Sequence, residues 1–236
     1  MLNQISPETH VEAPSAIRLR LAEQMLLLML NEGSGRIYPT SKQYLDYAIV
    51  GAIVLELVAK GYLRIHQGVI KRLNEDLTGD PVADGILSHL NSTLESENFI
   101  EALHRLSIES HRLIPLLIDS MRSKAVLEPG GDRYVWHIPS KMAAQYPFLN
   151  IKSHLHQLLF NNTKPSEQEI AFLWIAHVCN LISHLFDPES LRAIEARVRQ
   201  LVRFEIINHV ISNALDEFNK AVQELTTPVL APVKLS

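Results

Sequence analysis

Residues 44–60 read YLDYAIVGAIVLELVAK, and this stretch decides the fold. Its apolar residues are spread around all sides of a helix rather than gathered along one stripe. A helix that is apolar on every side must lie inside the protein. Gly61 follows directly, and glycine is the residue expected just past the end of a helix. The sequence therefore predicts a buried central helix that ends at Gly61.

The flanks of this stretch carry clear start and turn signals. Thr40-Ser41-Lys42-Gln43 is a capping-box pattern, which predicts that the central helix begins here. After Gly61, residues 62–66 and 69–73 are joined by Gln67-Gly68, a sequence typical of a β-hairpin turn. Asp80 followed by Pro81 then predicts the first turn of another helix.

The remaining segments extend this pattern over the whole chain. A second hairpin is predicted from residues 125–127 and 133–138, around the turn PGGD at 129–132. Residues 60–63 (KGYL) and 124–127 (KAVL) form a faint echo, because each follows a helix and leads into a hairpin. Further helices are predicted at 17–30, 81–90, 98–106, from Ser107 or Ser110 to Lys124, 150–160, 170–186, 188–203 and 205–222. We expect a mainly α fold, with one compact helical domain over residues 16–225, a buried central helix bundle and two small β-hairpins. Residues 1–15 and 226–236 are expected to be a flexible arm and tail.

Composition limits the classes of function. The chain has 236 residues, 47% of them hydrophobic, and a formal net charge of -4, so any site for an anionic partner must be a local patch. The single cysteine, Cys179, allows no disulfide within the chain, which fits a reducing compartment. Residues 1–14 lack the pattern of a signal peptide, and the apolar run 170–186 is interrupted by His177, Asn180 and His184. We expect a cytoplasmic protein whose membrane contact is peripheral.

Residues that often carry chemistry have simpler explanations here. His177 and His184 are seven residues apart on the predicted helix, but no Cys-x-x-Cys motif supplies further zinc ligands. Asp80 is explained as a helix cap, and Asp84 lies early enough in the same helix to favour its positive end. The sequence predicts no metal, no cofactor and no enzymatic activity.

The second hairpin carries aromatic residues beside cations, in Arg133, Tyr134, Val135 and Trp136. This combination suits a membrane interface, where rings sit at headgroup depth and cations meet phosphate. It also suits a wing that contacts nucleic acid, and Tyr134 and Trp136 could instead pack on the core.

Several motifs together resemble the Golgi phosphoprotein 3 family. They are the run from Gly51 to Ile65, the box Thr78-Gly79-Asp80-Pro81 with Asp84, the start LAEQMLLL at 21–28, KAVL at 124–127, Ile175-Ala-His177 with Phe186, and RVRQL at 197–201. Their order and spacing cover the chain from about Arg20 to about Leu215.

The resemblance implies a helical, non-enzymatic adaptor that binds phosphatidylinositol 4-phosphate at a membrane surface. The family's headgroup pocket contains a tryptophan and arginines, and these positions fall at Ser41, Val50, His111 and Ile114 here. Lys42 and Arg112 lie beside them. The resemblance therefore predicts headgroup binding by Ser41, Lys42, His111 and Arg112. It predicts membrane contact through the hairpin residues Arg133, Tyr134, Val135 and Trp136, which are also expected to support homo-oligomerisation.

Three functions remain open at this stage. The first is a peripheral membrane protein that binds an anionic phospholipid and a membrane-protein partner. The second is a protein-interaction domain without lipid binding. The third is a winged-helix-like nucleic-acid binder, which is disfavoured because residues 44–60 are too apolar to lie in a groove.

Overall fold

The computed structural model describes residues 17–31, 33–37, 42–90, 95–131, 135–146, 149–161, 165–203 and 209–227. The predicted arm at 1–15 and residues 228–236 of the predicted tail lie outside this part of the chain. The predicted tail begins too early, because Thr226 is the last residue of the final helix. The helices are α1 (Leu21–Leu28), α2 (Lys42–Ala59), α3 (Pro81–Leu87), α4 (Phe99–Ile108), α5 (Ser110–Ser123), α6 (Ser140–Gln145), α7 (Ile151–Phe160), α8 (Glu167–Val178), the 3-10 helix η3 (Ile182–His184), α9 (Pro188–Arg203) and α10 (His209–Thr226). The strands are β1 (Leu63–His66), β2 (Val69–Arg72), β3 (Ser96–Asn98), β4 (Glu128–Pro129) and β5 (Trp136–His137).

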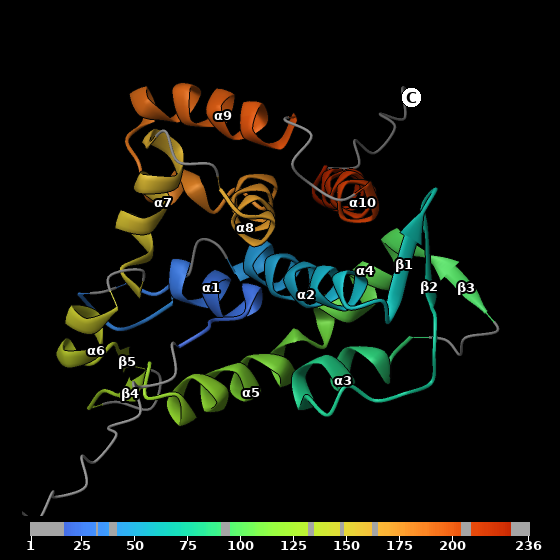
Figure 1. Ribbon diagram of the computed structural model, residues 1–236, viewed down its shortest axis with the longest axis horizontal. Coiled ribbons are helices and arrows are strands. Elements are labelled where there is room, and N and C mark those ends of the chain that lie inside the picture. The colour runs from blue at the N-terminus through green and yellow to red at the C-terminus, as the bar shows by residue number, and fades with distance from the viewer. Residues whose placement is uncertain are drawn as a thin grey trace, which may run out of the picture.

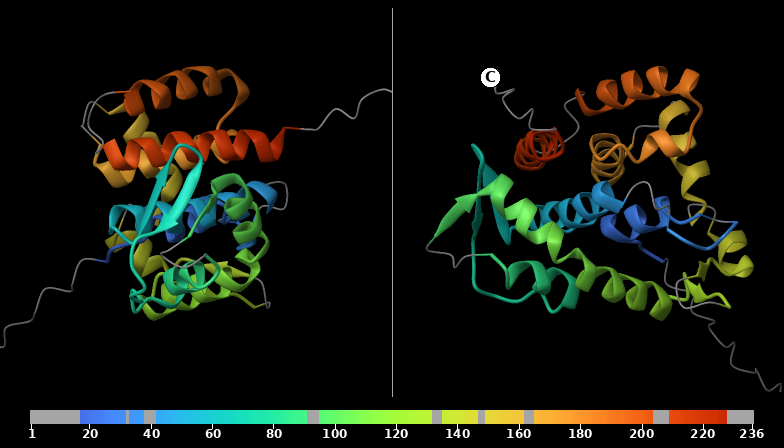
Figure 2. Two further views of the ribbon diagram at one scale, coloured as in Figure 1. Left: turned by 90° about the vertical axis from the view of Figure 1, so that its right-hand side faces the viewer. Right: turned by 180° about the vertical axis from the view of Figure 1, so that it is seen from behind.

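The predicted central helix is α2, and other helices cover it on both sides. Figure 1 shows α3 and α5 on one side, α8 and α10 on the other, and strands β1–β3 closing one end. The turned views show the same layers, with α9 and α10 farthest from α3 and α5 (Figure 2). Ile49, Val50 and Ala52 have 0% exposed surface. The prediction of a mainly α fold around a buried helix is confirmed.

Helix α10 approaches α2 at a glycine. A Cβ atom added to Gly51 would lie 2.2 Å from Cε2 of Phe218, a distance shorter than any normal carbon contact. The Phe218 ring is itself buried, with 1% of its surface exposed. The absence of a side chain at Gly51 therefore sets how closely α10 packs on the central helix.

Three helices end in the same backbone turn. Gly61, Ala125 and Asn180 all adopt positive φ angles, of 76°, 56° and 53°. In each case the next residue donates its N–H to the carbonyl five residues back, which is the Schellman arrangement. The bonds are Tyr62 to Leu57 (2.9 Å), Val126 to Met121 (2.8 Å) and Leu181 to Ala176 (2.8 Å). The sequence similarity between residues 60–63 and 124–127 thus reflects the same helix-ending motif at both places.

The predicted helix at 170–186 was too long. Helix α8 ends at Val178, and Asn180 turns the chain into the short η3. Asparagine tolerates this left-handed conformation better than most residues, so an apolar run alone did not reveal the stop. The sequence predicted that His177 and His184 share one face of a single helix. They instead belong to two different helices, α8 and η3.

The first hairpin forms as predicted but gains a third strand. Leu63 pairs with Arg72 and Ile65 with Ile70, while Gln67 and Gly68 make the turn with positive φ angles. Strand β3 then pairs with β2, so that Val69 lies opposite Asn98. The sequence did not predict β3 because residues 96–98 are polar and show no alternation.

The second hairpin is shorter than predicted. Its strands β4 and β5 contain two residues each, and Glu128 pairs with His137. The first strand was predicted at 125–127 but lies at Glu128–Pro129, because residues 125–127 complete the end of α5.

A buried ionic network holds α1 against the rest of the protein. The Glu23 side chain has 0% exposed surface, and both of its carboxylate oxygens lie 2.7 Å from Nζ of Lys124. Ser120 donates to Oε1 at 2.8 Å, and the backbone N–H of Arg20 donates to Oε2 at 2.9 Å. The carboxylate is therefore fully paired, as a buried charge must be.

Two further contacts extend this network to α2 and α3. Glu56 of α2 accepts the backbone N–H of Leu21, the first residue of α1. The Arg20 side chain pairs with Asp80, which also caps α3 by accepting the Val82 N–H at 3.0 Å. The start of α1 is thus tied to α2, α3 and α5.

Replacing Lys124 should destabilise the fold strongly. Lys124→Met leaves the Glu23 charge buried without its cation, which costs about 3–5 kcal/mol when a buried pair loses one partner. Urea unfolding of wild type and variant measures this loss. Arg122→Ala, which breaks the exposed pair with Asp119 on the same helix, should cost less than about 1 kcal/mol. Equal losses for the two variants would contradict this account of the network.

Gly51→Ala should also destabilise the protein, although alanine normally favours a helix over glycine by about 1 kcal/mol. The added methyl group must displace Phe218, and overpacking of this kind costs about 1–3 kcal/mol. In a Phe218→Leu background the same change should cost much less or become stabilising. A double-mutant cycle from denaturant unfolding checks this coupling. An unchanged cost in the two backgrounds would show that the ring does not set the spacing.

Candidate headgroup pocket

A pocket of about 650 Å³ lies between the second hairpin and α5. Its lining comes from three segments that are distant in the sequence. The residues are Arg36, Ile37, His111, Ile114, Pro115, Ile118, Asp119 and Trp136. Its volume falls within the range typical of small-ligand sites.

The backbone of a glycine turn positions Trp136. The Trp136 N–H donates to the Gly35 carbonyl oxygen at 2.7 Å. Gly35 has a φ of +66°, and a Cβ atom there would lie 2.7 Å from the Trp136 carbonyl oxygen, so the close approach requires glycine. Asn31 stabilises the same turn by accepting the N–H of Ser34 at 2.8 Å. The GSGR stretch at 33–36 is therefore a turn that brings Arg36 and Trp136 to one pocket.

Helix α5 supplies the opposite wall. His111 is exposed, and its Nδ1 lies 2.8 Å from the Ile108 carbonyl oxygen. Ile114 and Ile118 follow at helical spacing and are half-buried. Asp119 adds a carboxylate, which lies 3.2 Å from the Arg122 guanidinium. The pocket thus has apolar walls with one arginine, one histidine and one acidic residue.

The structure brings together residues that the sequence assigned to separate roles. His111, from the predicted headgroup site, and Trp136, from the predicted membrane hairpin, line this one pocket. Val135 is half-buried on the same arm, and its carbonyl accepts the Gly130 N–H at 2.7 Å. Arg112 points elsewhere, because its side chain is 68% exposed and lies 3.2 Å from Glu109.

Other predicted site residues cannot be placed. Ser41, Arg133 and Tyr134 lie outside the described residues, as does the Lys42 side chain. Among the positions that the resemblance relates to headgroup binding, Val50 is fully buried in the core and Ile114 lines the pocket. Their roles in binding stay predictions.

The sequence did not single out Arg36 and Asp119 as site residues. Arg36 follows a turn that was correctly recognised, but its position next to α5 depends on the Gly35–Trp136 contact. Asp119 lies on the same side of α5 as Ile118 and Pro115. Only the position of the hairpin shows which face of α5 borders a pocket.

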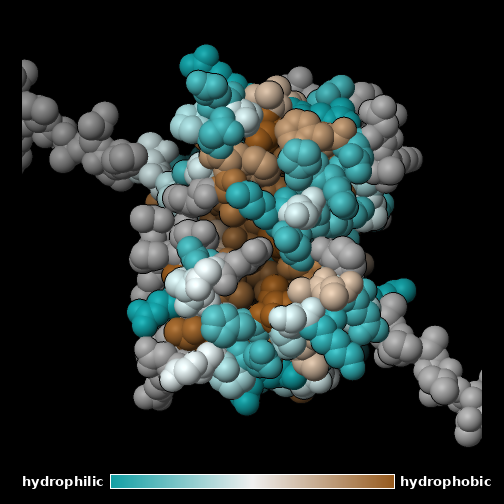
Figure 3. Space-filling view, turned by 90° about the vertical axis from the view of Figure 1, so that its left-hand side faces the viewer, coloured by the Kyte–Doolittle hydropathy of each residue, from teal (hydrophilic) through white to brown (hydrophobic). Residues whose placement is uncertain are grey.

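Apolar surface continues beside this pocket. Two smaller pockets open near β5, one with Leu30, Trp136 and Ile138 and the other with Leu30, Ile138 and Leu185 among their walls. Figure 3, which views the side where β4, β5, α6 and α7 lie in Figure 1, shows a band of hydrophobic residues flanked by hydrophilic ones. Trp136 thus borders both the pocket beside α5 and a smaller pocket near β5.

His177 and Cys179 pack within the fold. Burial lowers the pKa of His177 below the ordinary histidine value, and burial raises the pKa of the Cys179 thiol. His154 is half-buried, and its Nε2 lies 3.6 Å from Glu169. Within the described part of the chain, no three His, Cys, Asp or Glu side chains gather as a metal site would require.

The fold and the pocket define a class of protein: a helical domain with an amphipathic surface pocket beside a short hairpin. A model of the Golgi phosphoprotein 3 (GPP34) family matches residues 21–225. The chain therefore belongs to the Golgi phosphoprotein 3 family. A comparison with curated proteins gives no significant match. Among the described residues, no helix combines the length and the hydrophobicity needed to cross a lipid bilayer.

Proposed function

We propose that this protein is a non-enzymatic, peripheral membrane adaptor that binds anionic phospholipid headgroups in the pocket of Arg36, His111 and Trp136. The observation that supports the proposal is the convergence of the hairpin arm and α5 on one pocket. Family membership supports the same class of function. On this proposal the protein acts in the cytoplasm at a membrane surface.

The chemistry of the pocket suits the boundary between a headgroup and an acyl chain. Arg36 can meet a phosphate group, while Trp136 provides an amphipathic ring of the kind found at membrane interfaces. The isoleucines along α5 and Ile37 offer apolar contact below the polar rim. The net charge of -4 disfavours general attraction to anions, so binding depends on this local arrangement.

The pocket favours a lipid with a single phosphate group. Arg36 provides the positive charge, and Asp119 opposes a second phosphate. Phosphatidylglycerol matches this balance better than phosphatidylinositol 4-phosphate, the lipid that the family resemblance implies. A membrane-protein partner and self-association through β4–β5 remain predictions of the same resemblance.

The nucleic-acid alternative has less support. Helix α2, which precedes the first hairpin, is buried beneath other helices, and none of its side chains from Tyr44 to Val58 is exposed for contact with a groove. A protein-interaction domain without lipid binding is the remaining alternative, and it would leave the protein unbound to every vesicle type.

Vesicle flotation tests the proposal directly. The protein should float with phosphatidylcholine vesicles that contain phosphatidylglycerol, and higher salt should weaken this binding. Arg36→Ala should reduce binding about fivefold, since one cation near an anionic surface contributes about 1 kcal/mol. Trp136→Ala should reduce it as well. Cardiolipin and phosphatidylinositol 4-phosphate vesicles report the headgroup preference.

Two exposed arginines serve as controls for this experiment. Arg64→Ala removes a cation from β1, away from the pocket, and should leave binding unchanged. Arg112→Ala should also leave binding unchanged if this pocket is the lipid site, because the pocket does not include Arg112. Reduced binding would instead support the headgroup site predicted from the sequence. Equal binding by wild type, Arg36→Ala and Trp136→Ala would rule out the pocket as the lipid site.

Tryptophan fluorescence should report where the membrane lies. The Trp174→Phe variant leaves Trp136 as the sole tryptophan, because the chain has two. Anionic vesicles should shift its emission to shorter wavelength as the half-exposed ring enters the interface. The Trp136→Phe variant retains Trp174, whose Nε1–H donates to the Leu215 carbonyl oxygen at 3.3 Å, and should show no shift. A shift confined to Trp174 would place the contact on another face.

A further inference from the structure

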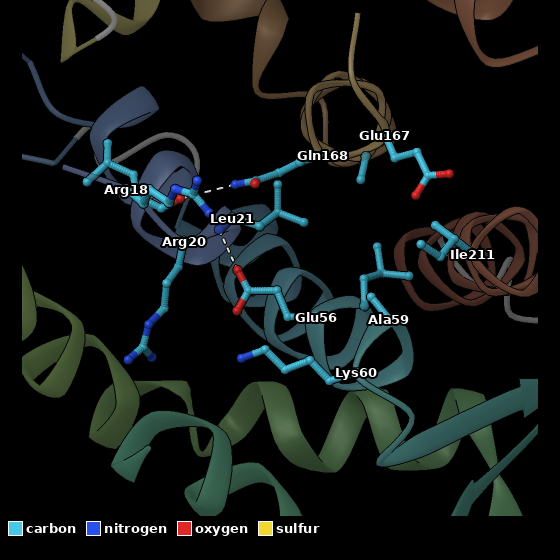
Figure 4. A pocket seen from close by; sticks show the side chains of 12 residues that line it. Arg18, Arg20, Leu21, Glu56, Ala59, Lys60, Glu167, Gln168 and Ile211 are labelled. Carbon is cyan, nitrogen blue, oxygen red and sulfur yellow. Dashed lines mark hydrogen bonds between the residues drawn. The ribbon is translucent and has the colours of Figure 1, made fainter. Parts of the chain in front are cut away.

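A second pocket, unrelated to the hairpin, opens where four helices meet. It has a volume of about 460 Å³ and lies between the start of α1, the end of α2 and the starts of α8 and α10. Figure 4 shows Glu56 reaching across toward Leu21, with Gln168 and Ile211 on other walls. Its lining residues are Arg18, Leu19, Arg20, Leu21, Leu55, Glu56, Ala59, Lys60, Glu167, Gln168, Ala171 and Ile211.

Most of the pocket wall is apolar. Leu21, Leu55 and Ala171 are buried in the fold and present only their pocket-facing atoms, with exposed fractions of 3%, 3% and 5%. Ala59 is exposed although it lies between packed helices, so its small side chain leaves the pocket open. A cavity with apolar walls and a few converging polar groups is the usual form of a small-ligand site.

Two cations that form no salt bridge within the described residues border this pocket. Among the described residues, neither the Arg18 guanidinium nor the Lys60 ammonium makes an ion pair or a hydrogen bond. Arg20 differs, because its side chain is occupied by Asp80. The available positive charge therefore belongs to long side chains that can reach a group at the pocket mouth.

Glu56 provides the polar group inside. One of its oxygens accepts the Leu21 N–H, and the other has no hydrogen-bond partner in the described part of the chain. Burial raises the pKa of Glu56, an effect opposed by the Leu21 N–H and by the nearby charges of Lys60 and Arg20. The neutral carboxyl group carries an O–H that can donate to an anion, whereas the ionised group would repel one.

We propose that this pocket binds a single-chain anionic amphiphile, whose apolar chain lies along Leu55, Ala59 and Ile211 and whose acidic group meets Lys60 or Arg18. The two cations at the pocket mouth support an anion, since Arg18 and Lys60 form no salt bridge within the described residues, whereas Arg20 is paired with Asp80. The apolar walls support a chain rather than a free phosphate or other small ion. This site is independent of the proposed headgroup pocket, which uses different elements.

Titration calorimetry with decanoate, below its micelle concentration, tests the proposal. Decanoate should bind, whereas acetate, which lacks the chain, should not. Decanol should bind more weakly because it lacks the charge. Lys60→Gln and Arg18→Gln together should weaken decanoate binding by about three- to tenfold, the range expected for exposed charge contacts. Arg64→Gln, on β1, is the matched control and should leave it unchanged.

Two further variants keep the test decisive. Ala59→Phe fills the pocket from an exposed position and should abolish binding of decanoate and decanol, while far-UV circular dichroism verifies the fold. Glu56→Gln removes the opposing charge and should preserve or strengthen decanoate binding.

Decylamine, a cationic amphiphile of the same chain length, is the opposite probe. If decylamine binds more tightly than decanoate and Glu56→Gln abolishes that binding, Glu56 is the anchor and the proposal is wrong. Decanoate binding unaffected by Ala59→Phe would also overturn it.

Discussion

The buried carboxylate of Glu23 is the interaction on which the arrangement of this protein depends. A charge with no exposed surface is stable only when cations and donors surround it, and Lys124, Ser120 and the Arg20 N–H do so here. These partners come from the end of α5 and the start of α1, about a hundred residues apart in the sequence. The requirement to pair one charge therefore fixes how the first helix docks on the remainder of the fold.

The same network explains the motifs that carry the family resemblance. Glu23 belongs to the LAEQM start, Lys124 to the KAVL stretch and Asp80 to the Thr-Gly-Asp-Pro box. In the box, Asp84 accepts the Thr78 hydroxyl at 2.7 Å, so these side chains mainly shape the entry to α3. The recognisable residues are thus largely connectors between helices. They identify the fold more surely than they identify a ligand, because a fold can be retained while its sites change.

Local signals in the sequence predicted the parts of the fold that local physics decides. The burial of α2, the cap at Asp80 and the Gln67-Gly68 turn all follow from short patterns. The third strand and the end of α8 were missed because backbone pairing and a left-handed asparagine leave little trace in hydrophobicity. His111 and Trp136, which the sequence assigned to two separate roles, line one pocket, and Arg36 reaches that pocket through the Gly35 contact. The sequence of either segment alone does not reveal that the two segments are in contact.

Both pockets are built around α1, and this affects how each can be studied. The residues just before and at the start of α1 line the pocket of Glu56, and the turn that follows α1 brings Arg36 to the pocket of His111 and Trp136. Loss of the Glu23–Lys124 pair would loosen α1 and disturb both sites together. Ala59 and Trp136, by contrast, lie outside that network and each lines a different pocket. Changes at these two residues therefore separate the sites, because each alters one wall and leaves the docking of α1 intact.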